Sequence, residues 1–404
     1  MADRIDRPEY VKKLINFKDK DVIKVITGVR RSGKSVLMEI FQDYLTDTGV
    51  SAEQIVSINL EDYDFLSLHD PDMLHKYIKE RLLKNKKMYI FIDEIQNCKG
   101  FPQVIDSLYI KKNVDIYITG SNAFMLSSEI STLLSGRYIE VKVFPLSFKE
   151  YVSSAQDGNS LAEKYTHYLE RSSFPYALSF GGNIEEIRIY LEGLYNTIIV
   201  KDIGSRMNVS DSMILESIIR YLFDNIGSIV STKKIADTLT SSGRKIDTKT
   251  VEKYLKGLLD SFIIYQAKRY NVKGKQYLKT LEKYYVIDIG MRFFMLGTAN
   301  ADTGHILENI VYLELLRRDY EVYVGKVEGL EVDFVIRERN KTTYIQVSAS
   351  VREEATLKRE LRPLEMINDH YPKLLLTLDE DPEADFNGIR KINALKWLVG
   401  DTEI

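Results

Sequence analysis

One short stretch near the N-terminus restricts the fold of this chain more than any other feature. Gly28-Val29-Arg30-Arg31-Ser32-Gly33-Lys34-Ser35 lies between the apolar run Val22 to Thr27 and the run Val36 to Phe41, which begins a predicted helix. Glycines near both ends let the backbone turn tightly, so that consecutive N–H groups point inward, and the helix N-terminus adds partial positive charge. The stretch therefore predicts a loop that holds nucleotide phosphates between a strand and a helix.

Each residue type in this loop has a predicted task. Lys34 would reach the β- and γ-phosphates, and the Ser35 hydroxyl would bind Mg²⁺. Arg30 and Arg31 would add phosphate contacts, although most exposed arginines are only solvated. The residues expected to contact the nucleotide are Gly28, Arg30, Arg31, Ser32, Gly33, Lys34, Ser35 and Val36. ATP with Mg²⁺ is thus the predicted cofactor.

The region from about residue 20 to 145 alternates short apolar runs with helical patterns, which is typical of a parallel sheet covered by helices on both faces. The predicted strands are rich in Ile, Val, Tyr and Phe, as strands prefer. They are Val22 to Thr27, Gln54 to Leu60, Met88 to Ile92, Val114 to Thr119 and Tyr138 to Phe144. The first part of the chain is therefore predicted to be an α/β nucleotide-binding domain.

Two acids follow the predicted strand Met88 to Ile92. Ligands of α/β folds bind at the carboxyl ends of the strands, so Asp93 is placed to hold Mg²⁺. Glu94 then becomes the candidate general base or polariser of an attacking water. Two solvated turn acids would be the simpler interpretation, but the phosphate loop upstream favours the catalytic one.

Two further residues are candidates for the same reaction. Asn122 follows the strand ending at Thr119 and is suited to sensing the γ-phosphate or holding the water; a simple polar turn is the alternative. Arg137 could be an arginine finger that acts in a neighbouring subunit of a homo-oligomer, because such guanidiniums neutralise transition-state charge. A surface or intrachain salt bridge is the competing interpretation for Arg137.

The remainder of the chain divides into three predicted parts. Amphipathic helices are expected at Phe148 to Ser153, Ser160 to Arg171, Ile184 to Asn196 and Ser210 to Asn225. Two short helices capped by Ser231 or Thr232 and by Asp247, followed by the strand Phe262 to Ala267, have a winged-helix pattern. A smaller α/β unit follows, with helices His305 to Arg318 and about Glu353 to Ile367 and strands Tyr320 to Val324, Leu330 to Ile336, Thr343 to Val347 and Lys373 to Leu378. The predicted domains are 1–148 (nucleotide-binding core), 149–208 (helical lid), 209–285 (winged helix) and 286–404.

Composition excludes several classes of protein. One cysteine in 404 residues, Cys98, rules out an internal disulfide framework, and a net charge of −3 gives no global attraction to nucleic acid or anionic lipid. No apolar run approaches the roughly 20 residues that span a bilayer, and no charged-then-apolar leader opens the chain. A cytoplasmic location without membrane attachment is expected.

The motifs together resemble the archaeal and bacterial AAA+ ATPases, which usually carry a second domain of unknown function at their C-terminus. The resemblance covers nearly the whole chain and implies ATP binding, ATP hydrolysis, a winged helix and a terminal domain similar to restriction-endonuclease-like nucleases. It rests on Thr27 to Ser35, Phe91-Ile92-Asp93-Glu94-Ile95-Gln96, Thr119-Gly120-Ser121-Asn122, Leu134-Ser135-Gly136-Arg137 and Pro145 to Tyr151.

The terminal domain departs from the nuclease pattern that the resemblance implies. Such a nuclease needs a Glu on its first helix, an Asp on a strand, and an acid two residues before a Lys on the next strand, to hold Mg²⁺ and activate water. Glu308 and Asp333 match the first two requirements, but Gln346 replaces the acid and Ser348 replaces the Lys. An inactive nuclease fold used for binding or scaffolding is therefore favoured over an active one.

The stretch from Lys233 to Lys283 is locally basic, and in a winged helix the second helix enters the major groove. Lys249 and Lys253 would then face DNA, with Arg244 on the preceding loop, but protein contact is an equally good interpretation. The leading hypothesis is an ATPase whose nucleotide state controls binding of DNA or a partner protein. The alternatives are a non-hydrolysing nucleotide-dependent adaptor and an ATP-dependent nuclease.

Overall fold

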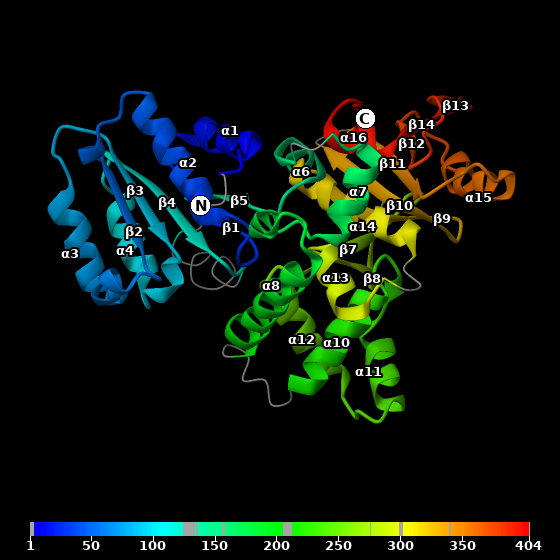
Figure 1. Ribbon diagram of the computed structural model, residues 1–404, viewed down its shortest axis with the longest axis horizontal. Helices are drawn as coiled ribbons and strands as arrows, with labels where there is room; N and C mark the ends of the chain where they lie inside the picture. Colours follow the sequence, from blue (N-terminus) through cyan, green and yellow to red (C-terminus); the bar gives the residue numbers. More distant parts are fainter. Residues whose placement is uncertain are drawn as a thin grey trace. The chain divides into compact units, whose positions relative to one another are not determined.

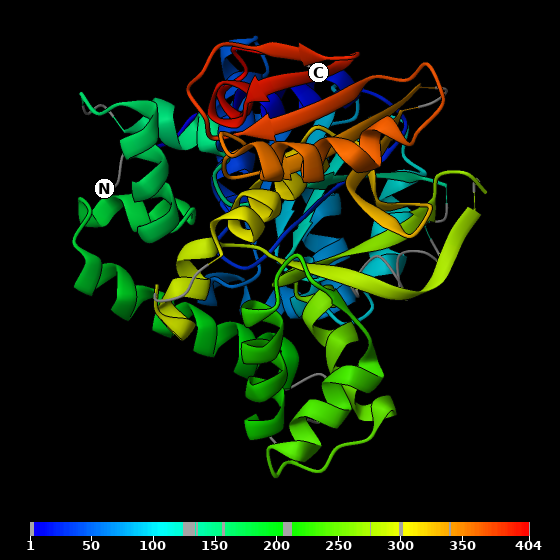
Figure 2. The same ribbon diagram turned by 90° about the vertical axis from the view of Figure 1, so that its right-hand side faces the viewer.

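The computed structural model describes residues 4–123, 134, 136–155, 158–204, 212–274, 276–298, 302–338 and 341–403. The chain forms two compact units (Figures 1 and 2). Unit 1 comprises Met1–Pro145 with Asp260–Phe262, and unit 2 comprises Leu146–Leu259 with Ile263–Ile404. The four-part division expected from the sequence stays a prediction.

Unit 1 contains a five-stranded sheet in the order β2-β3-β4-β1-β5, and every neighbouring pair is parallel. Its strands are β1 (Ile23–Thr27), β2 (Ile55–Asn59), β3 (Met88–Asp93), β4 (Val114–Gly120) and β5 (Tyr138–Lys142). All five lie where the sequence predicts them, within one or two residues at each end, which confirms the expected α/β fold. Because β3, β4 and β1 are neighbours and parallel, their carboxyl ends lie at the same edge of the sheet.

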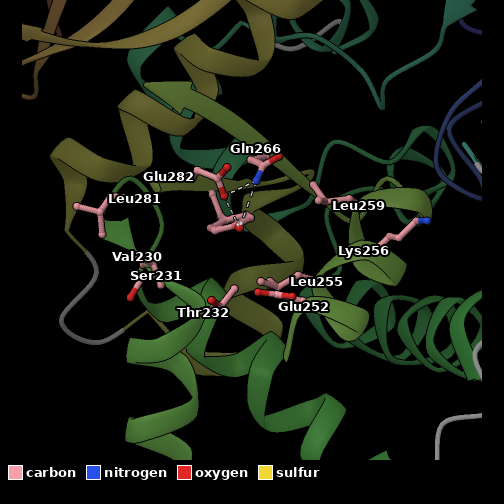
Figure 3. Close-up of a pocket in the computed structure, with 11 residues that line it drawn as sticks. Val230, Ser231, Thr232, Glu252, Leu255, Lys256, Leu259, Gln266, Leu281 and Glu282 are labelled. Atoms are coloured by element: carbon pink, nitrogen blue, oxygen red, sulfur yellow. Dashed lines mark hydrogen bonds between the residues drawn. The ribbon is translucent and has the colours of Figure 1, made fainter. Parts of the chain in front are cut away.

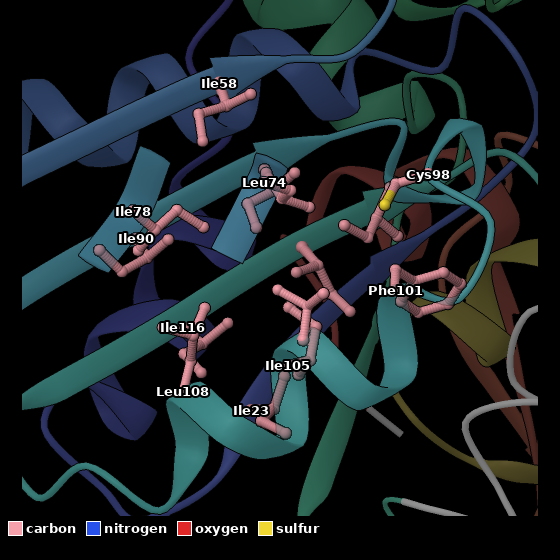
Figure 4. Close-up of a cluster of buried hydrophobic side chains, with 14 of the residues drawn as sticks. Ile23, Ile58, Leu74, Ile78, Ile90, Cys98, Phe101, Ile105, Leu108 and Ile116 are labelled. Atoms are coloured by element: carbon pink, nitrogen blue, oxygen red, sulfur yellow. The ribbon is translucent and has the colours of Figure 1, made fainter. Parts of the chain in front are cut away.

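Helices cover both faces of this sheet: α1 (Pro8–Phe17), α2 (Lys34–Asp47), α3 (Pro71–Arg81) and α4 (Phe101–Tyr109). Alternate residues of β3 point to opposite faces. Ile90 and Ile92 pack with side chains of α3 and α4 in one cluster (Figure 4), whereas Tyr89 and Phe91 pack with side chains of α1 and α2 in another. Burial on both faces explains why β3 is apolar from Met88 to Ile92.

Unit 2 is built on a nine-stranded sheet in the order β13-β14-β12-β11-β10-β9-β7-β8-β6. The strands are β6 (Ile229–Val230), β7 (Ile264–Asn271), β8 (Gln276–Val286), β9 (Glu321–Val327), β10 (Leu330–Glu338), β11 (Lys341–Ser348), β12 (Lys373–Thr377), β13 (Ala384–Phe386) and β14 (Ile389–Asn393). The helices are α6 (Phe148–Ser154), α7 (Leu161–Glu170), α8 (Ile184–Thr197), α10 (Ser212–Asp224), α11 (Thr232–Ser241), α12 (Thr248–Asp260), α13 (Ile289–Leu296), α14 (Thr303–Arg317), α15 (Glu354–Glu365) and α16 (Ala394–Val399). Ser210, where the sequence begins its fourth helix, lies outside the described residues.

Helices α11 and α12 begin at the predicted caps. The Ser231 hydroxyl accepts the Lys234 N–H at 3.1 Å, and Asp247 accepts the Thr250 N–H at 2.7 Å. The strand that follows α12, β7, forms an antiparallel hairpin with β8. The other edge of β7 pairs in parallel with β9. The hairpin and the C-terminal strands therefore belong to one sheet, which the sequence does not reveal because this pairing joins distant residues.

The single cysteine, Cys98, lies in the core of unit 1 and can be used to test its packing. Cys98 is fully buried in the cluster between the sheet, α3 and α4 (Figure 4), and burial, with a smaller contribution from Asp70, raises the pKa of its thiol to about 11. Since the thiolate is the reactive form, we expect the native chain to resist N-ethylmaleimide at pH 7.5 and to react once it is denatured. Mass spectrometry of labelled protein measures this; rapid stoichiometric labelling of the native chain would contradict the described packing.

Candidate functional site

The loop between β1 and α2 depends on a glycine that lies against the backbone of the segment after β5. Gly28 has a φ of +149°, and a Cβ placed on it would lie 2.0 Å from the Val143 carbonyl oxygen, just beyond β5. Gly33, with a φ of +95°, precedes the first residue of α2. Both positions therefore need glycine for the loop to fit between the strand and the helix.

Lys34 folds back over the loop. Its ammonium donates to the carbonyl oxygens of Gly28 at 3.0 Å and Val29 at 3.1 Å, and the side chain is buried. The Ser32 hydroxyl is also buried and has no hydrogen-bond partner among the described residues. A buried hydroxyl without a partner is costly unless a ligand supplies one. This loop therefore fits a phosphate group.

The other predicted loop contacts are more exposed. Ser35 and Val36 lie on the exposed side of the first turn of α2, and Arg31 is exposed with a φ of +66°. Arg30 makes an ion pair of 2.9 Å with Glu61. All four residues lie in the loop or at the N-terminus of α2. Their contact with nucleotide stays a prediction.

Sequence reasoning missed Arg7, which supports this loop from outside it. The buried guanidinium donates to the carbonyl oxygens of Ser32 at 3.0 Å and Phe144 at 2.9 Å. It also lies over the ring of Tyr10, 4.6 Å from the ring centroid. Arg7 thus joins the phosphate loop to the segment after β5. Nothing local in the sequence signals this, because both partners are backbone groups distant along the chain.

The two predicted acids lie at the carboxyl end of β3 and are both buried. The Thr119 hydroxyl of β4 donates to the Asp93 carboxylate and accepts the Glu94 N–H at 2.9 Å. Glu94 has a φ of +50°, a left-handed conformation that a non-glycine residue adopts only when its surroundings hold it there. Its carboxylate accepts a hydrogen bond from the Gln96 side-chain amide. The orientation of Glu94 is thus fixed on two sides.

The tip of β4 adds polar groups to the same edge. Asn122 is buried, as is Ser121, whose hydroxyl has no hydrogen-bond partner among the described residues. The side-chain Oε1 of Gln96 is likewise buried without a described partner. Because the pairing places Thr27 beside Gly120 and Ile92 beside Ile118, the loop after β1 and the residues after β3 and β4 share one edge of the sheet. A bound nucleotide would find unused hydrogen-bonding groups there.

These residues fit ATP and Mg²⁺. The loop and the N-terminus of α2 would hold the phosphates, while Ser35 and Asp93 would hold the ion. When bound, Mg²⁺ would neutralise phosphate charge during transfer.

Arg137 is not brought to the phosphate loop of its own chain. It precedes β5, whereas the loop follows β1, and because these strands are parallel, the two positions lie at opposite edges of the sheet. The guanidinium makes an ion pair with Asp106 and lies over the Tyr109 ring. A role for Arg137 within the same chain has no geometric support, so its function in a neighbouring subunit stays a prediction.

Comparison with known proteins establishes the family. Residues 20–152 match a family described as an AAA domain, and residues 162–302 match a domain of unknown function. Over 399 residues the chain is 40% identical to an uncharacterised protein of Haemophilus influenzae, covering 98% of both chains. The chain belongs to the AAA+ P-loop ATPase family. The predicted resemblance is thereby confirmed.

Other similarities agree with AAA+ membership. The chain is 32% identical to an uncharacterised protein of Methanocaldococcus jannaschii, covering 85% of this chain and 78% of that protein. Its fold is similar to that of a Walker-type ATPase of Pyrococcus abyssi, with a TM-score of 0.51 and 16% identity, over 72% of this chain and 95% of the other. No helix in the described part of this AAA+ protein is both long and apolar enough to cross a membrane.

The basic residues predicted to face DNA have different surroundings. Lys249 and Lys253 are exposed on α12. Arg244, in contrast, donates to the Met213 carbonyl oxygen and the Ser217 hydroxyl of α10, so it fastens the loop between α11 and α12 to that helix. Of the three residues predicted to face DNA, the two on α12 are therefore the better candidates.

A cavity of about 370 Å³ lies between α11, α12 and the β7–β8 hairpin (Figure 3). The Glu282 carboxylate accepts hydrogen bonds from the Gln266 amide and, at 3.1 Å, from the Tyr284 hydroxyl. Glu252 and Lys256 also line the cavity. Among the described residues that line the cavity, two carboxylates stand against one ammonium, which disfavours entry of a phosphate group.

Three of the four residues predicted around an inactive nuclease site come together in unit 2. Glu308 lies on α14, Asp333 on β10 and Gln346 on β11. The side-chain Oε1 of Gln346 accepts the Asp333 backbone N–H at 3.3 Å, and its Nε2 donates to the Glu360 carboxylate at 2.9 Å. Ser348 turns away, donating its hydroxyl to the Ser350 carbonyl oxygen at 3.1 Å. The replacement of Lys by Ser therefore leaves no cation at that position.

A lysine from another strand reaches the acids instead. Lys283 of β8 is buried, and sequence reasoning did not connect it with this site. Burial alone would lower the pKa of Lys283, but the carboxylates of Glu308, Asp333 and Glu331 raise it above the usual lysine value. Burial and repulsion from Glu308 raise the pKa of Asp333 well above its usual range. The cluster thus contains a fixed positive charge.

The contact between Gly28 and Val143 predicts the effect of a single methyl group. In Gly28→Ala the new Cβ would collide with a backbone carbonyl, so we expect a loss of stability of about 1–3 kcal/mol and loss of ATP binding. Gly49→Ala is the matched control, because Gly49 also has a positive φ (+96°) but nothing within 4 Å of the added Cβ. Thermal unfolding and binding of a fluorescent ATP analogue measure both. Wild-type nucleotide affinity in Gly28→Ala would refute the described loop.

Proposed function

We propose that this protein binds ATP with Mg²⁺, hydrolyses it, and uses the nucleotide state to control binding of DNA or a partner protein. The observation that carries the hydrolytic part is the arrangement at one sheet edge of Lys34, Asp93 and Glu94 with buried polar atoms that have no partner among the described residues. Membership in the AAA+ family supports the same reaction.

Each residue has a role in the proposed reaction. Lys34 exchanges the carbonyl oxygens of Gly28 and Val29 for phosphate oxygens, so the ammonium never lacks acceptors. Asp93, oriented by Thr119, and Ser35 hold Mg²⁺. Glu94 orients and polarises the attacking water.

Two further proposals concern the surroundings of this site. Asn122, at the tip of β4, senses the γ-phosphate. Arg137 completes the site of a neighbouring copy in a homo-oligomer, after leaving its ion pair with Asp106.

The helices α11 and α12 with the following hairpin form the proposed binding module, a winged helix. Exposed Lys249 and Lys253 on the second helix favour the phosphate backbone of DNA as the partner. A partner protein with an acidic surface is the alternative on the same helix, since two lysines also suit carboxylates.

ATP turnover tests the proposed enzyme. We expect Lys34→Ala to lose nucleotide binding, and Glu94→Gln to bind ATP but turn it over about 10²–10⁴-fold more slowly, because it lacks the group that activates water. Glu53→Gln, an exposed glutamate of the same unit, is the matched control and should keep wild-type turnover. Phosphate release measures the rates and equilibrium dialysis the binding.

The same assay separates the enzyme from a non-hydrolysing adaptor in which ATP only orders the domains. The adaptor predicts tight binding with negligible turnover in the wild type, even with DNA or a partner supplied. Equal background rates in the wild type and both site variants would therefore exclude the proposed enzyme.

Salt dependence tests the DNA contact. If Lys249 and Lys253 each neutralise one phosphate, replacing both with Ala should weaken duplex binding and reduce the slope of log K against log salt by about 2. Lys358→Ala, on α15, is the control, since this lysine is exposed but lies outside the proposed module. Fluorescence anisotropy at several salt concentrations measures the slope. An unchanged slope in the double variant would favour the partner protein.

A further inference from the structure

Three acidic side chains of unit 2 surround one buried ammonium. The Lys283 nitrogen lies 2.8 Å from a Glu308 oxygen, 2.6 Å from a Glu331 oxygen and 3.9 Å from an Asp333 oxygen. The three acids come from α14 and β10, and Lys283 comes from β8, near the C-terminal end of that strand at Val286. Only 3% of the Lys283 side chain is exposed, so water contributes little to its solvation.

The remaining hydrogen-bonding capacity of these acids is largely used. The oxygen of Glu308 that meets Lys283 also accepts the Tyr285 hydroxyl at 2.6 Å. A Cβ on Gly227 would lie 3.0 Å from the other Glu308 oxygen, so the backbone closes that side. The second oxygen of Asp333 accepts the Val347 N–H at 2.8 Å. The carboxylate oxygens of Glu308 and Asp333 therefore already have partners: the Lys283 ammonium, the Tyr285 hydroxyl and the Val347 N–H.

This arrangement does not fit a divalent metal. Mg²⁺ and Mn²⁺ need several oxygen ligands around one point, and the ammonium occupies the position between these carboxylates. Gln346, which would supply a third ligand on β11, instead bonds Asp333 and Glu360. Among the residues that the structure describes, no three His, Cys, Asp or Glu side chains are placed to hold a metal ion.

We propose that Lys283 is the built-in cation of this cluster and takes the place that a nuclease would give to a metal. The ammonium compensates Glu308 and Glu331 permanently, lies beside Asp333, and fastens β8, a strand of the proposed binding module, to α14 and β10. This cluster therefore needs no divalent metal to connect β8 with α14 and β10. Unit 2 does not use the cluster to cleave DNA. This proposal goes beyond ATP hydrolysis and does not depend on it.

Replacing the ammonium by a neutral stem of similar size tests the proposal. In Lys283→Met the carboxylates lose their cation, so we expect a lower midpoint of thermal unfolding, and Mn²⁺ should raise that midpoint again by binding the exposed oxygens. Lys283→Met/Glu308→Gln, which removes one uncompensated charge, should be more stable than Lys283→Met without metal. All proteins carry Asp93→Asn and are free of nucleotide, so that the ATP site does not bind Mn²⁺.

The matched control is Lys391→Met. Lys391 is a buried lysine of β14 in the same sheet, but its nearest acid is exposed Asp381 at 4.0 Å, so Mn²⁺ should leave this variant unchanged. If Lys283→Met is unfolded without metal, Mn²⁺ should refold it, as circular dichroism would show. Failure of Mn²⁺ to stabilise or refold Lys283→Met would overturn the proposal. Two results with the chain that retains Lys283 would also overturn the proposal. One is DNA cleavage that depends on Asp333, and the other is a rise in its unfolding midpoint when Mn²⁺ is added.

Discussion

The contact between the Gly28 backbone and the Val143 carbonyl is the constraint on which the candidate nucleotide site depends. It leaves no room for a side chain, so the phosphate loop must follow one path between β1 and the segment after β5. Arg7 fixes the same path from the other side through the carbonyl oxygens of Ser32 and Phe144. A loop held at both ends is ordered before any ligand arrives, which lowers the cost of ordering it on binding.

The parallel sheet brings the remaining site residues to that loop. Since β4 pairs with both β1 and β3, a single residue of β4, Thr119, orients Asp93 and holds the backbone of Glu94. The left-handed backbone of Glu94 costs free energy that its neighbours must offset. The position and orientation of the acids therefore depend on neighbouring strands as well as on β3. A substitution of Thr119 in β4 would change the orientation of Asp93 and Glu94.

Local patterns allowed much of this to be predicted, and long-range contacts explain the rest. The phosphate loop, the strand positions and the caps Ser231 and Asp247 follow from short motifs, because neighbours in sequence determine them. Arg7 and Lys283 could not be found in this way, since their partners lie more than twenty residues away. For the same reason the parallel pairing of β7 with β9 was missed, although each strand alone was expected.

The most direct test of the central claim, that Lys34 is poised on its own loop to receive ATP, is a structure of Glu94→Gln bound to ATP and Mg²⁺. We predict that the Lys34 ammonium leaves the carbonyl oxygens of Gly28 and Val29 for the β- and γ-phosphates, that the Ser32 hydroxyl gains a partner, and that Asp93 faces the ion. Nucleotide bound elsewhere, or Lys34 still on both carbonyl oxygens with ATP present, would contradict this account.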